Sequence, residues 1–356
     1  VMKLVEVVAG VRTAPWVTEF LTGLGARMGR VPVNVADVPG FLVNQVGRGY
    51  TIEAAHMLSE NIAEPVDFDR IMRDAAGFRM GPFELLDLTA LDVTHPATEA
   101  IYGQHFHEPR YRPSSMMKTR MDAGLLGRKT KQGYYLYDEG AQQIPEETAA
   151  PRYDGRPVWV STAAPKDGAT LNALVETLGG KLEASARPSA EALILVTPLG
   201  KDATATAIEQ DLDAGRTVAV DMLCGLDRRR TLMTTPITRP EFAAAAHGLL
   251  ASDGTPATLI RDSVGFPSQR IIAMIVNIGC AIAQSGAASP EDIDKAVQLG
   301  LNYPYGPFGF GDTYGAAKIL AILEAMHGLT GDPRYRPTPW LRRRAQLGVS
   351  LLTEES

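Results

Sequence analysis

The sequence predicts a multidomain protein in which helical units alternate with α/β units. Between residues 156 and 262, β-branched apolar runs alternate with helical stretches, which is typical of an α/β layer with a mostly parallel sheet. Residues 41–126 have helical periodicity and no convincing strand, and the chain becomes helical again from about residue 263 to its end. An internal repeat relates the two helical parts to each other.

The composition excludes several classes of protein. With 356 residues, 45% of them hydrophobic and 21% charged, the chain is long and apolar enough for two or three packed domains. A formal net charge of −6 disfavours nucleic acid or an anionic membrane as the main partner. The longest apolar run, 271–283, is too short to cross a membrane and contains Asn277, so we expect a buried helix there.

Two cysteines, Cys224 and Cys280, stand in no CxxC or metal-ligand spacing. We therefore expect buried free thiols, a reducing cytoplasmic environment and no metal site. A basic stretch, "GRKTK" at 127–131, offers a site for a small anion.

Residues 1–36 are predicted to form two strands and a helix. The run Val1–Val8 is apolar and β-branched, which is typical of a sheet interior, and it carries one acid, Glu6. "RVPVNVAD" predicts a second strand. The helix between them has these residues on one side: Trp16, Val17, Phe20, Leu21 and Leu24.

Residues 37–138 are predicted to form a helical unit. Its first helix starts at about Phe41, after the Pro39-Gly40 break. Further helices follow in "DFDRIMRDAAG", "GPFELLDLTALDVTHPATEAIY" and "PSSMMKTRMDAG", and the unit closes with the basic and aromatic "GRKTKQGYYLYD". Residues 139–155, rich in Pro, Gln, Glu and Ala, are predicted to be a linker.

Residues 156–262 are predicted to form the α/β segment, and residues 263–356 a second helical unit. The predicted strands are "PVWVS", "ALILVTP", "TVAVDML", "RTLMTT" and "ATLIRD". Helices are predicted between them in "GATLNALVETLG" and "ATATAIEQDLDAG".

The internal repeat has a register of 225 residues without a gap. In this register three separate clusters coincide, so chance is a poor explanation. The coinciding pairs are Asp37 and Asp262, Gly40 and Gly265, Phe41 and Phe266, Asp67 and Asp292, Asp69 and Asp294, Gly81-Pro82-Phe83 and Gly306-Pro307-Phe308, and Asp87 and Asp312. After a one-residue slip, "YRPSS" at 111 matches "YRPTP" at 335.

Four motifs, "VMKLVEVV", "DVPGFLVNQ", "MGPFELLD" and "GRKTKQGYYLYD", together resemble the L-3-hydroxyacyl-CoA dehydrogenase family. The two-copy layout is similar to its tandem bacterial members, of the 3-hydroxybutyryl-CoA or 3-hydroxyadipyl-CoA type, which act in fatty-acid or aromatic catabolism. The resemblance covers residues 1–137 strongly and 262–340 more weakly. It implies helical domains of the 6-phosphogluconate-dehydrogenase type in two copies, with a degenerate Rossmann-like α/β segment between them.

The resemblance also implies that residues 1–36 are the end of a Rossmann NAD-binding domain. The family's glycine-rich loop and its catalytic histidine precede this strand, so we expect the sequence to be a fragment that lacks the cofactor domain and is inactive alone. A glycine-rich loop and a histidine twelve residues before Glu6, encoded upstream, would settle the matter.

The resemblance assigns roles to several residues. Glu6 matches the carboxylate that holds the catalytic histidine, the alternative being a strand-end acid that faces solvent. Asn44 matches an asparagine at the reactive end of the substrate, the alternative being an asparagine satisfied by local backbone. Lys129 matches a lysine that reaches NAD, the alternative being a solvated basic loop. Met80, Pro82 and Phe83 are candidates for the acyl pocket, and ordinary packing is an equal alternative.

In the second copy, the 225-residue register aligns Thr231 with Glu6 and Gln269 with Asn44. Ala219 stands at the position that corresponds to the family's catalytic base. We therefore expect the second copy not to be catalytic. Because the family's helical domains pair across a dimer, we expect either a homodimer or an internal pseudo-dimer of the two helical units.

The predicted activity is thus NAD-dependent oxidation of an L-3-hydroxyacyl-CoA. Two alternatives stay open. One is a dimerisation or substrate-binding module that keeps the fold without catalysis, and the other is a different hydroxy-acid dehydrogenase on the same scaffold.

Overall fold

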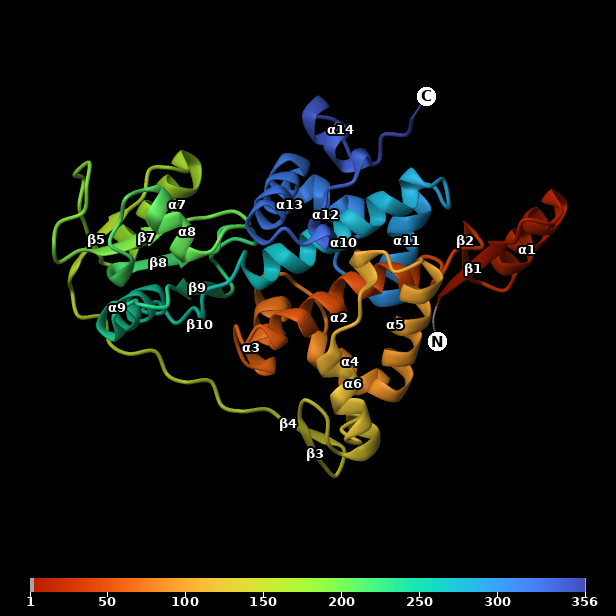
Figure 1. Ribbon diagram of the computed structural model, residues 1–356, viewed down its shortest axis with the longest axis horizontal. Helices are drawn as coiled ribbons and strands as arrows, with labels where there is room; N and C mark the ends of the chain where they lie inside the picture. Colours follow the sequence, from red (N-terminus) through yellow and green to blue (C-terminus); the bar gives the residue numbers. More distant parts are fainter. Residues whose placement is uncertain (1–2, 356) are drawn as a thin grey trace.

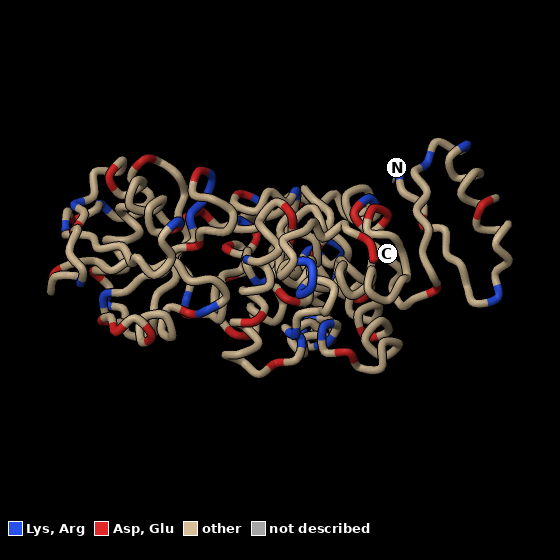
Figure 2. Tube along the Cα trace, turned by 90° about the horizontal axis from the view of Figure 1, so that it is seen from above, with Lys and Arg blue, Asp and Glu red and all other residues tan. Residues whose placement is uncertain are grey.

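The computed structural model describes residues 3–355, so Val1 and Met2 of the predicted first strand lie outside the described residues. Strand β1 (Leu4–Ala9) pairs in parallel with β2 (Val31–Ala36), and α1 (Pro15–Arg27) connects them. This small unit projects from one end of the molecule (Figures 1 and 2). The three predicted elements are confirmed, but the apolar side of α1 is largely exposed, with Trp16 at 67% and Phe20 at 54%. Two strands cover only one side of the helix.

The first helical unit, predicted over residues 37–138, is helical as far as residue 130, whereas its last residues form strand β3 (Leu136–Asp138). Its main helices are α2 (Val43–Ser59), α3 (Pro65–Arg70), α4 (Pro82–Thr89), α5 (Leu91–Gln104) and α6 (Ser115–Asp122). A π-helical turn (Ile71–Ala75) continues α3, and short 3-10 turns form at Pro109–Tyr111 and Arg128–Thr130.

An antiparallel hairpin of β3 (Leu136–Asp138) and β4 (Ala141–Gln143) follows this unit. Its two central residues, Glu139 and Gly140, have φ angles of 48° and 85°, the backbone of a tight two-residue hairpin turn. Strand β4 therefore lies inside the segment predicted as a linker. The irregular connection to the next unit begins only after Gln143 and crosses the molecule in an extended form (Figure 1).

The α/β segment contains a six-stranded sheet in the order β10-β9-β8-β7-β5-β6. All five predicted strands are confirmed, and only the two-residue β6, too short to show a period, was missed. The elements are β5 (Pro157–Val160), α7 (Pro165–Thr177), β6 (Lys181–Leu182), β7 (Leu193–Val196), α8 (Ala203–Glu209), β8 (Thr217–Val220), β9 (Arg230–Thr234), α9 (Pro240–Leu250) and β10 (Ala257–Ile260).

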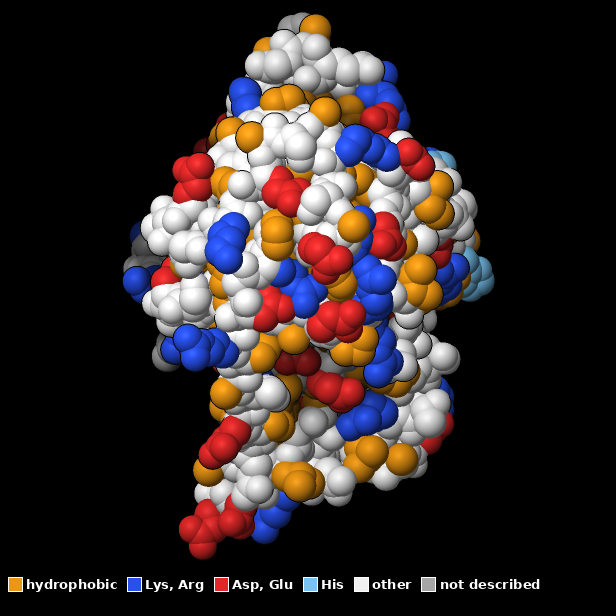
Figure 3. Space-filling view, turned by 90° about the vertical axis from the view of Figure 1, so that its left-hand side faces the viewer, with side chains coloured by type: hydrophobic (Ala, Val, Ile, Leu, Met, Phe, Trp, Pro, Cys, Tyr) orange, Lys and Arg blue, Asp and Glu red, His pale blue; other side chains and the backbone are white. Residues whose placement is uncertain are grey.

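The sheet is mostly parallel, as predicted. Strand β9 runs antiparallel to β8 because the short connection between them contains no crossover helix. The outer face of this segment carries acidic and basic side chains in a mixed pattern (Figure 3).

The second helical unit consists of α10 (Pro267–Gln284), α11 (Pro290–Leu301), α12 (Pro307–Tyr314), α13 (Ala316–Thr330) and α14 (Pro339–Leu347), with a 3-10 turn at Pro333–Tyr335. Four of these helices begin with a proline, whose missing N–H costs nothing at the first helical position. Helix α10 is almost entirely buried, as predicted. Within residues 3–355, no helix is both long and apolar enough to cross a membrane.

The two helical units share one hydrophobic core, which also includes residues of β1, β2 and one face of the six-stranded sheet. A second core lies on the other face of that sheet, within the α/β segment. Helix α2 packs against α10 near the centre of the molecule (Figure 1). At their crossing a Cβ on Gly49 would lie 3.1 Å from the backbone nitrogen of Ile275, so the glycine permits the close approach. Nearby, two ion pairs are reciprocal: Arg112 pairs with Asp332 at 2.6 Å, and Arg336 pairs with Glu108 at 3.4 Å.

A buried ion network also joins α2 to the second unit. Arg270 donates to Glu53 at 2.8 Å, to both carboxylate oxygens of Glu60 at 2.6 and 2.9 Å, and to the Tyr335 hydroxyl at 2.8 Å. Burial alone would favour neutral Glu53, but Arg334 and Arg270 outweigh it and lower the pKa of Glu53 to about 2.

Candidate functional site

The carboxylate of Glu6 caps the start of α2. Its Oε1 accepts hydrogen bonds from the backbone N–H groups of Leu42 at 2.8 Å and Val43 at 3.2 Å. The first N–H groups of a helix have no intrahelical acceptor, and a negative charge there is favourable. Glu6 therefore does more than face solvent: it attaches β1 to α2. Its Oε2 makes no hydrogen bond to any residue in the described part of the chain.

Asn44 follows directly in the first turn of α2. Its side chain is exposed, and within residues 3–355 its amide has no hydrogen-bond partner. Its main-chain oxygen accepts a bond from Arg48 Nε at 3.0 Å. The structure thus brings Glu6 and Asn44 together and leaves the Asn44 amide open to a ligand.

Lys129 lies apart from this pair. It forms an ion pair with Asp92, at the beginning of α5. The opposite end of α5 lies near the start of α2, because His105 contacts the Pro39 carbonyl oxygen there at 3.3 Å. A helix of 14 residues is about 21 Å long. The role of Lys129 as a cofactor contact remains a prediction.

Pro82 and Phe83 are buried inside the first helical unit. Phe83 is 0% exposed, and its ring lies 5.6 Å from Phe68 and 4.7 Å from Tyr134. Met80 is half-buried, and its carbonyl accepts the Tyr50 hydroxyl at 2.7 Å. This burial favours ordinary packing for Pro82 and Phe83, while the acyl-pocket role stays a prediction.

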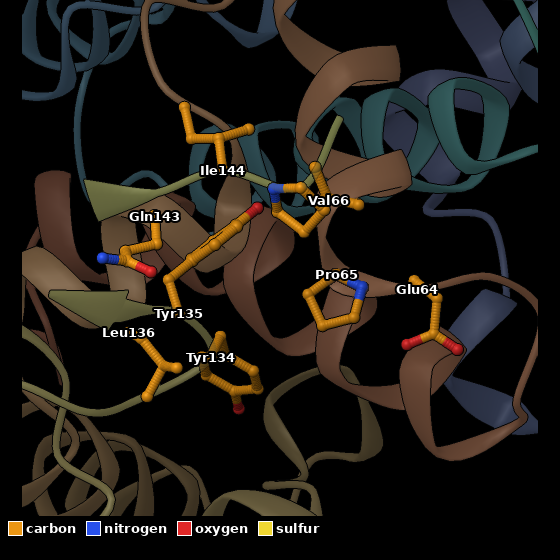
Figure 4. A pocket seen from close by; sticks show the side chains of 9 residues that line it. Glu64, Pro65, Val66, Tyr134, Tyr135, Leu136, Gln143 and Ile144 are labelled. Atoms are coloured by element: carbon orange, nitrogen blue, oxygen red, sulfur yellow. The ribbon is translucent and has the colours of Figure 1, made fainter. Parts of the chain in front are cut away.

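A pocket of about 520 Å³ lies between α3 and the β3–β4 hairpin (Figure 4). Pro65 and Val66 of α3 face Tyr135, the residue just before β3, across it. None of the six residues assigned from the sequence lines this pocket, so the candidate site lies elsewhere.

Sequence reasoning missed Arg48, which stands one turn after Asn44 on α2. Arg48 is 9% exposed and donates to Thr98 Oγ1 at 2.7 Å and to the Thr94 carbonyl at 3.4 Å. No carboxylate in the described part of the chain pairs with it. Every other buried arginine there has a carboxylate oxygen within 3.9 Å: Arg70, Arg110, Arg216, Arg229, Arg230, Arg270, Arg334 and Arg344. The available signal was a cation in an otherwise apolar helical stretch.

In the second unit, the residues that correspond to Asn44 and Glu6 are buried and not open to a ligand. Gln269, which matches Asn44, is 0% exposed and bonds to the Gly200 N–H at 2.8 Å and to Asp221 at 2.9 Å. Thr231, which matches Glu6, is also buried and carries no charge. A Cβ on Gly200 would lie 2.4 Å from the Ile322 carbonyl oxygen, so the α/β segment lies directly on the helical unit here. These contacts favour the prediction that the second unit is not catalytic.

The α/β segment does not open with a dinucleotide-binding loop. The turn after β5, residues 161–164, contains no glycine, and α7 begins with Pro165, which has no N–H to offer a phosphate. No histidine of the described chain contacts Glu6, and no group of three His, Cys, Asp or Glu there could hold a metal ion.

Comparison with known proteins points to one family. The model of the 3-hydroxyacyl-CoA dehydrogenase C-terminal domain matches residues 40–137 and 265–351. The 3-hydroxyadipyl-CoA dehydrogenase of Escherichia coli K12 is 35% identical over 98% of this chain, which spans 68% of that protein. The mitochondrial hydroxyacyl-coenzyme A dehydrogenase of Sus scrofa is 37% identical over 38% of this chain and 43% of its own length. Among solved structures, the 3-hydroxybutyryl-CoA dehydrogenase of Escherichia coli K12 superimposes with a TM-score of 0.82 at 33% identity, over 98% of this chain and 68% of that one.

Proposed function

Because the chain belongs to the 3-hydroxyacyl-CoA dehydrogenase family, we propose that it acts in the NAD-dependent oxidation of L-3-hydroxyacyl-CoA to 3-oxoacyl-CoA. One observation carries the proposal: a carboxylate, Glu6, is fixed at the start of α2 beside the open amide of Asn44. The relatives' names include both hydroxybutyryl and hydroxyadipyl substrates, so they leave the acyl chain open.

The chain's own residues supply orientation and charge. The chemistry that bound NAD would supply is acceptance of a hydride from C3, and a base would remove the hydroxyl proton. Glu6 Oε2 is oriented by the two bonds that hold Oε1, and it can accept an N–H from an imidazole base and stabilise the imidazolium. The Asn44 amide donates to a thioester or hydroxyl oxygen and so fixes the substrate. We assign no step to a dinucleotide cradle among residues 3–355.

The two helical units are, on this proposal, copies of one domain with different roles. Asp69 accepts the N–H groups of Phe83 and Glu84 at 2.8 and 3.0 Å, and Asp294 accepts those of Phe308 and Gly309, both at 2.9 Å. The second copy supports α2 from the position that a partner subunit occupies in a symmetric dimer. The closed Gln269 position supports this structural role for it.

Binding and turnover test the proposal separately. Calorimetry with acetoacetyl-CoA should show binding that Asn44→Ala weakens by about tenfold, the worth of one hydrogen bond to a charged or polarised oxygen. As a matched control, Asn61→Ala, on an exposed turn away from the start of α2, should leave the affinity unchanged. NADH formation from L-3-hydroxyacyl-CoA and NAD, by an enzyme that joins this chain to a dinucleotide-binding domain with its histidine, gives the second readout. A protein that binds no acyl-CoA would contradict the proposal.

A further inference from the structure

Two cavities adjoin each other at the start of α3. The first, of about 520 Å³, is the pocket between α3 and the β3–β4 hairpin (Figure 4). The second, of about 360 Å³, lies between α3, β10 and residues 144–148 of the extended connection, a segment that we call the strap. Glu64 and Val66 line both cavities, so the two form one continuous groove along the strap.

The first cavity is the apolar end of the groove. Leu136 and Ile144 line it and are 54% and 50% exposed, so two aliphatic side chains there have little cover from the rest of the protein. The Tyr135 hydroxyl donates to Asp69 at 2.6 Å, which fixes the tyrosine ring in the wall. An apolar cavity with a fixed aromatic wall suits aliphatic side chains of a ligand.

The second cavity is the acidic end of the groove. Glu64 and Glu146 line it, are exposed, and form no ion pair within residues 3–355. The other acids of its lining are paired: Asp67 with Arg70 at 3.9 Å, and Glu147 with Arg229 at 2.5 Å. Burial lowers the pKa of His247, which a hydrogen bond to the Ala257 backbone opposes, so this ring adds no charge at pH 7. The two unpaired carboxylates therefore favour positive charge in a ligand.

A sheet edge and an extended backbone also line the acidic end. Strand β10 is the outermost strand on one side of the six-stranded sheet, and its residues 257–259 line the cavity. The strap has backbone N–H groups at every residue except Pro145, and none of them has an acceptor in the described part of the chain. An open sheet edge beside free backbone donors is the arrangement to which an extended peptide adds as a strand.

We propose that the groove binds an extended segment of a partner protein, added as a strand at the free edge of β10. Aliphatic side chains of this segment occupy the first cavity, and basic side chains lie beside Glu64 and Glu146. The strap, with five residues, spans at most about 17 Å when extended, so a partner segment of similar length fills the groove. None of the six residues assigned from the sequence lines the groove, so this inference goes beyond the proposed function and does not depend on it.

Short labelled peptides and the whole chain test the proposal by fluorescence anisotropy. The peptide Leu-Val-Leu-Lys-Lys, or its reversed sequence, should bind about tenfold more tightly than the same peptide with glutamates in place of its lysines. Both directions are needed because a strand can add in parallel or antiparallel. N-methylation of alternate amides in the better binder should weaken it about tenfold, because it removes backbone hydrogen bonds and keeps the charge.

Two variants with the same change of charge locate the binding site. Glu146→Lys should weaken binding of the lysine peptide about fivefold. Glu176→Lys, at an exposed residue of α7 outside the groove, should leave the affinity close to that of the wild type. Glu146 lies in an irregular exposed segment, so its substitution should not impair folding, and binding of acetoacetyl-CoA should stay unchanged.

The inference and the proposed function fail separately in these experiments. The inference is overturned if neither lysine peptide binds at about 1 mM, or if the lysine and glutamate peptides bind equally. It is also overturned if the N-methylated peptide keeps its affinity, which would leave only charge attraction, or if Glu146→Lys and Glu176→Lys have equal effects. Loss of acyl-CoA binding in the wild type would contradict the proposed function alone.

Discussion

Gln45 and Arg270 stand at equivalent positions of the 225-residue register, and each donates a hydrogen bond to a tyrosine hydroxyl. Gln45 Nε2 reaches Tyr111 at 2.6 Å, and Arg270 Nη2 reaches Tyr335 at 2.8 Å. The same contact is made by a neutral amide in the first unit and by a positively charged guanidinium in the second. Only the guanidinium also binds two carboxylates, that of Glu53 in α2 and that of Glu60 just after α2. The second unit therefore supports the first by an ionic network that has no counterpart in the reverse direction.

Glu6 has a structural role as a helix cap and a proposed catalytic role, and two variants distinguish these roles. Glu6→Ala removes the acceptor of the Leu42 and Val43 N–H groups and should lower the free energy of unfolding by about 1–2 kcal/mol. Glu6→Gln keeps an acceptor oxygen but not the charge, so its stability should stay near wild type while turnover falls about 10²–10⁴-fold. Chemical denaturation of this chain measures the first effect, and NADH formation by an enzyme that joins this chain to a dinucleotide-binding domain with its histidine measures the second. Full turnover in Glu6→Gln would end the catalytic assignment.

The Arg270–Glu53 network should make stability depend on acid. The folded pKa of Glu53 is about 2, below its ordinary value of 4.5, so the ionised form stabilises the folded state. This contribution is complete above pH 4.5 and is lost as the pH falls from 4.5 toward 2. Urea denaturation between pH 2 and 7 should show the loss in the wild type, and Glu53→Gln should show a smaller slope.

Removing only the cation of this network should be more harmful than removing both charges. Arg270→Met leaves Glu53 buried with one of its two arginine partners gone, which should cost about 3–5 kcal/mol. The double variant Arg270→Met with Glu53→Gln should recover part of that loss. Additive effects of the two substitutions would contradict the coupling that the 2.8 Å contact implies.

The equivalent capping residues Asp69 and Asp294 provide a matched pair. Asp294→Ala frees the N–H groups of Phe308 and Gly309 and should cost about 1–3 kcal/mol. Asp69→Ala should cost about 1 kcal/mol more, because Asp69 also accepts the Tyr135 hydroxyl at 2.6 Å. Thermal melting of both variants tests this order, and an equal loss would show that the tyrosine bond adds nothing.

Separating the two halves should expose the face of α2 that packs on α10. A chain cut near residue 150 retains the first helical unit but loses the contacts of Ile275 with Gly49 and of Arg270 with the buried Glu53. We expect self-association or loss of helicity, seen by size-exclusion chromatography and circular dichroism. A monomeric first unit with unchanged helicity would refute a supporting role for the second unit.

Local patterns predicted the elements well, and tertiary contacts explain what they missed. The strands of the α/β segment are continuous apolar runs, so their positions could be read directly, whereas the β3–β4 hairpin depends on two positive φ angles at Glu139 and Gly140. The apolar side of α1 was visible in the sequence, but its exposure follows from a sheet with only two strands.

The site could be predicted only in part. Motif order selected Glu6 and Asn44, which the structure brings together, and Lys129, which it places at the far end of α5. The cap that Glu6 forms on α2 joins residues 36 and 37 positions apart, beyond any local pattern. For Arg48 the sequence shows only a cation in a largely apolar helical stretch, because the lack of a carboxylate partner among the described residues depends on the tertiary structure.

The reciprocal pairs Arg112–Asp332 and Arg336–Glu108 join halves of one polypeptide rather than two subunits. Covalent linkage keeps the halves at a high effective concentration, so their pairing does not weaken on dilution. In a symmetric pair of identical chains, every substitution is present twice. Here each half can vary alone, so one can keep an accessible amide at Asn44 while the other buries its counterpart, Gln269, in an internal bond.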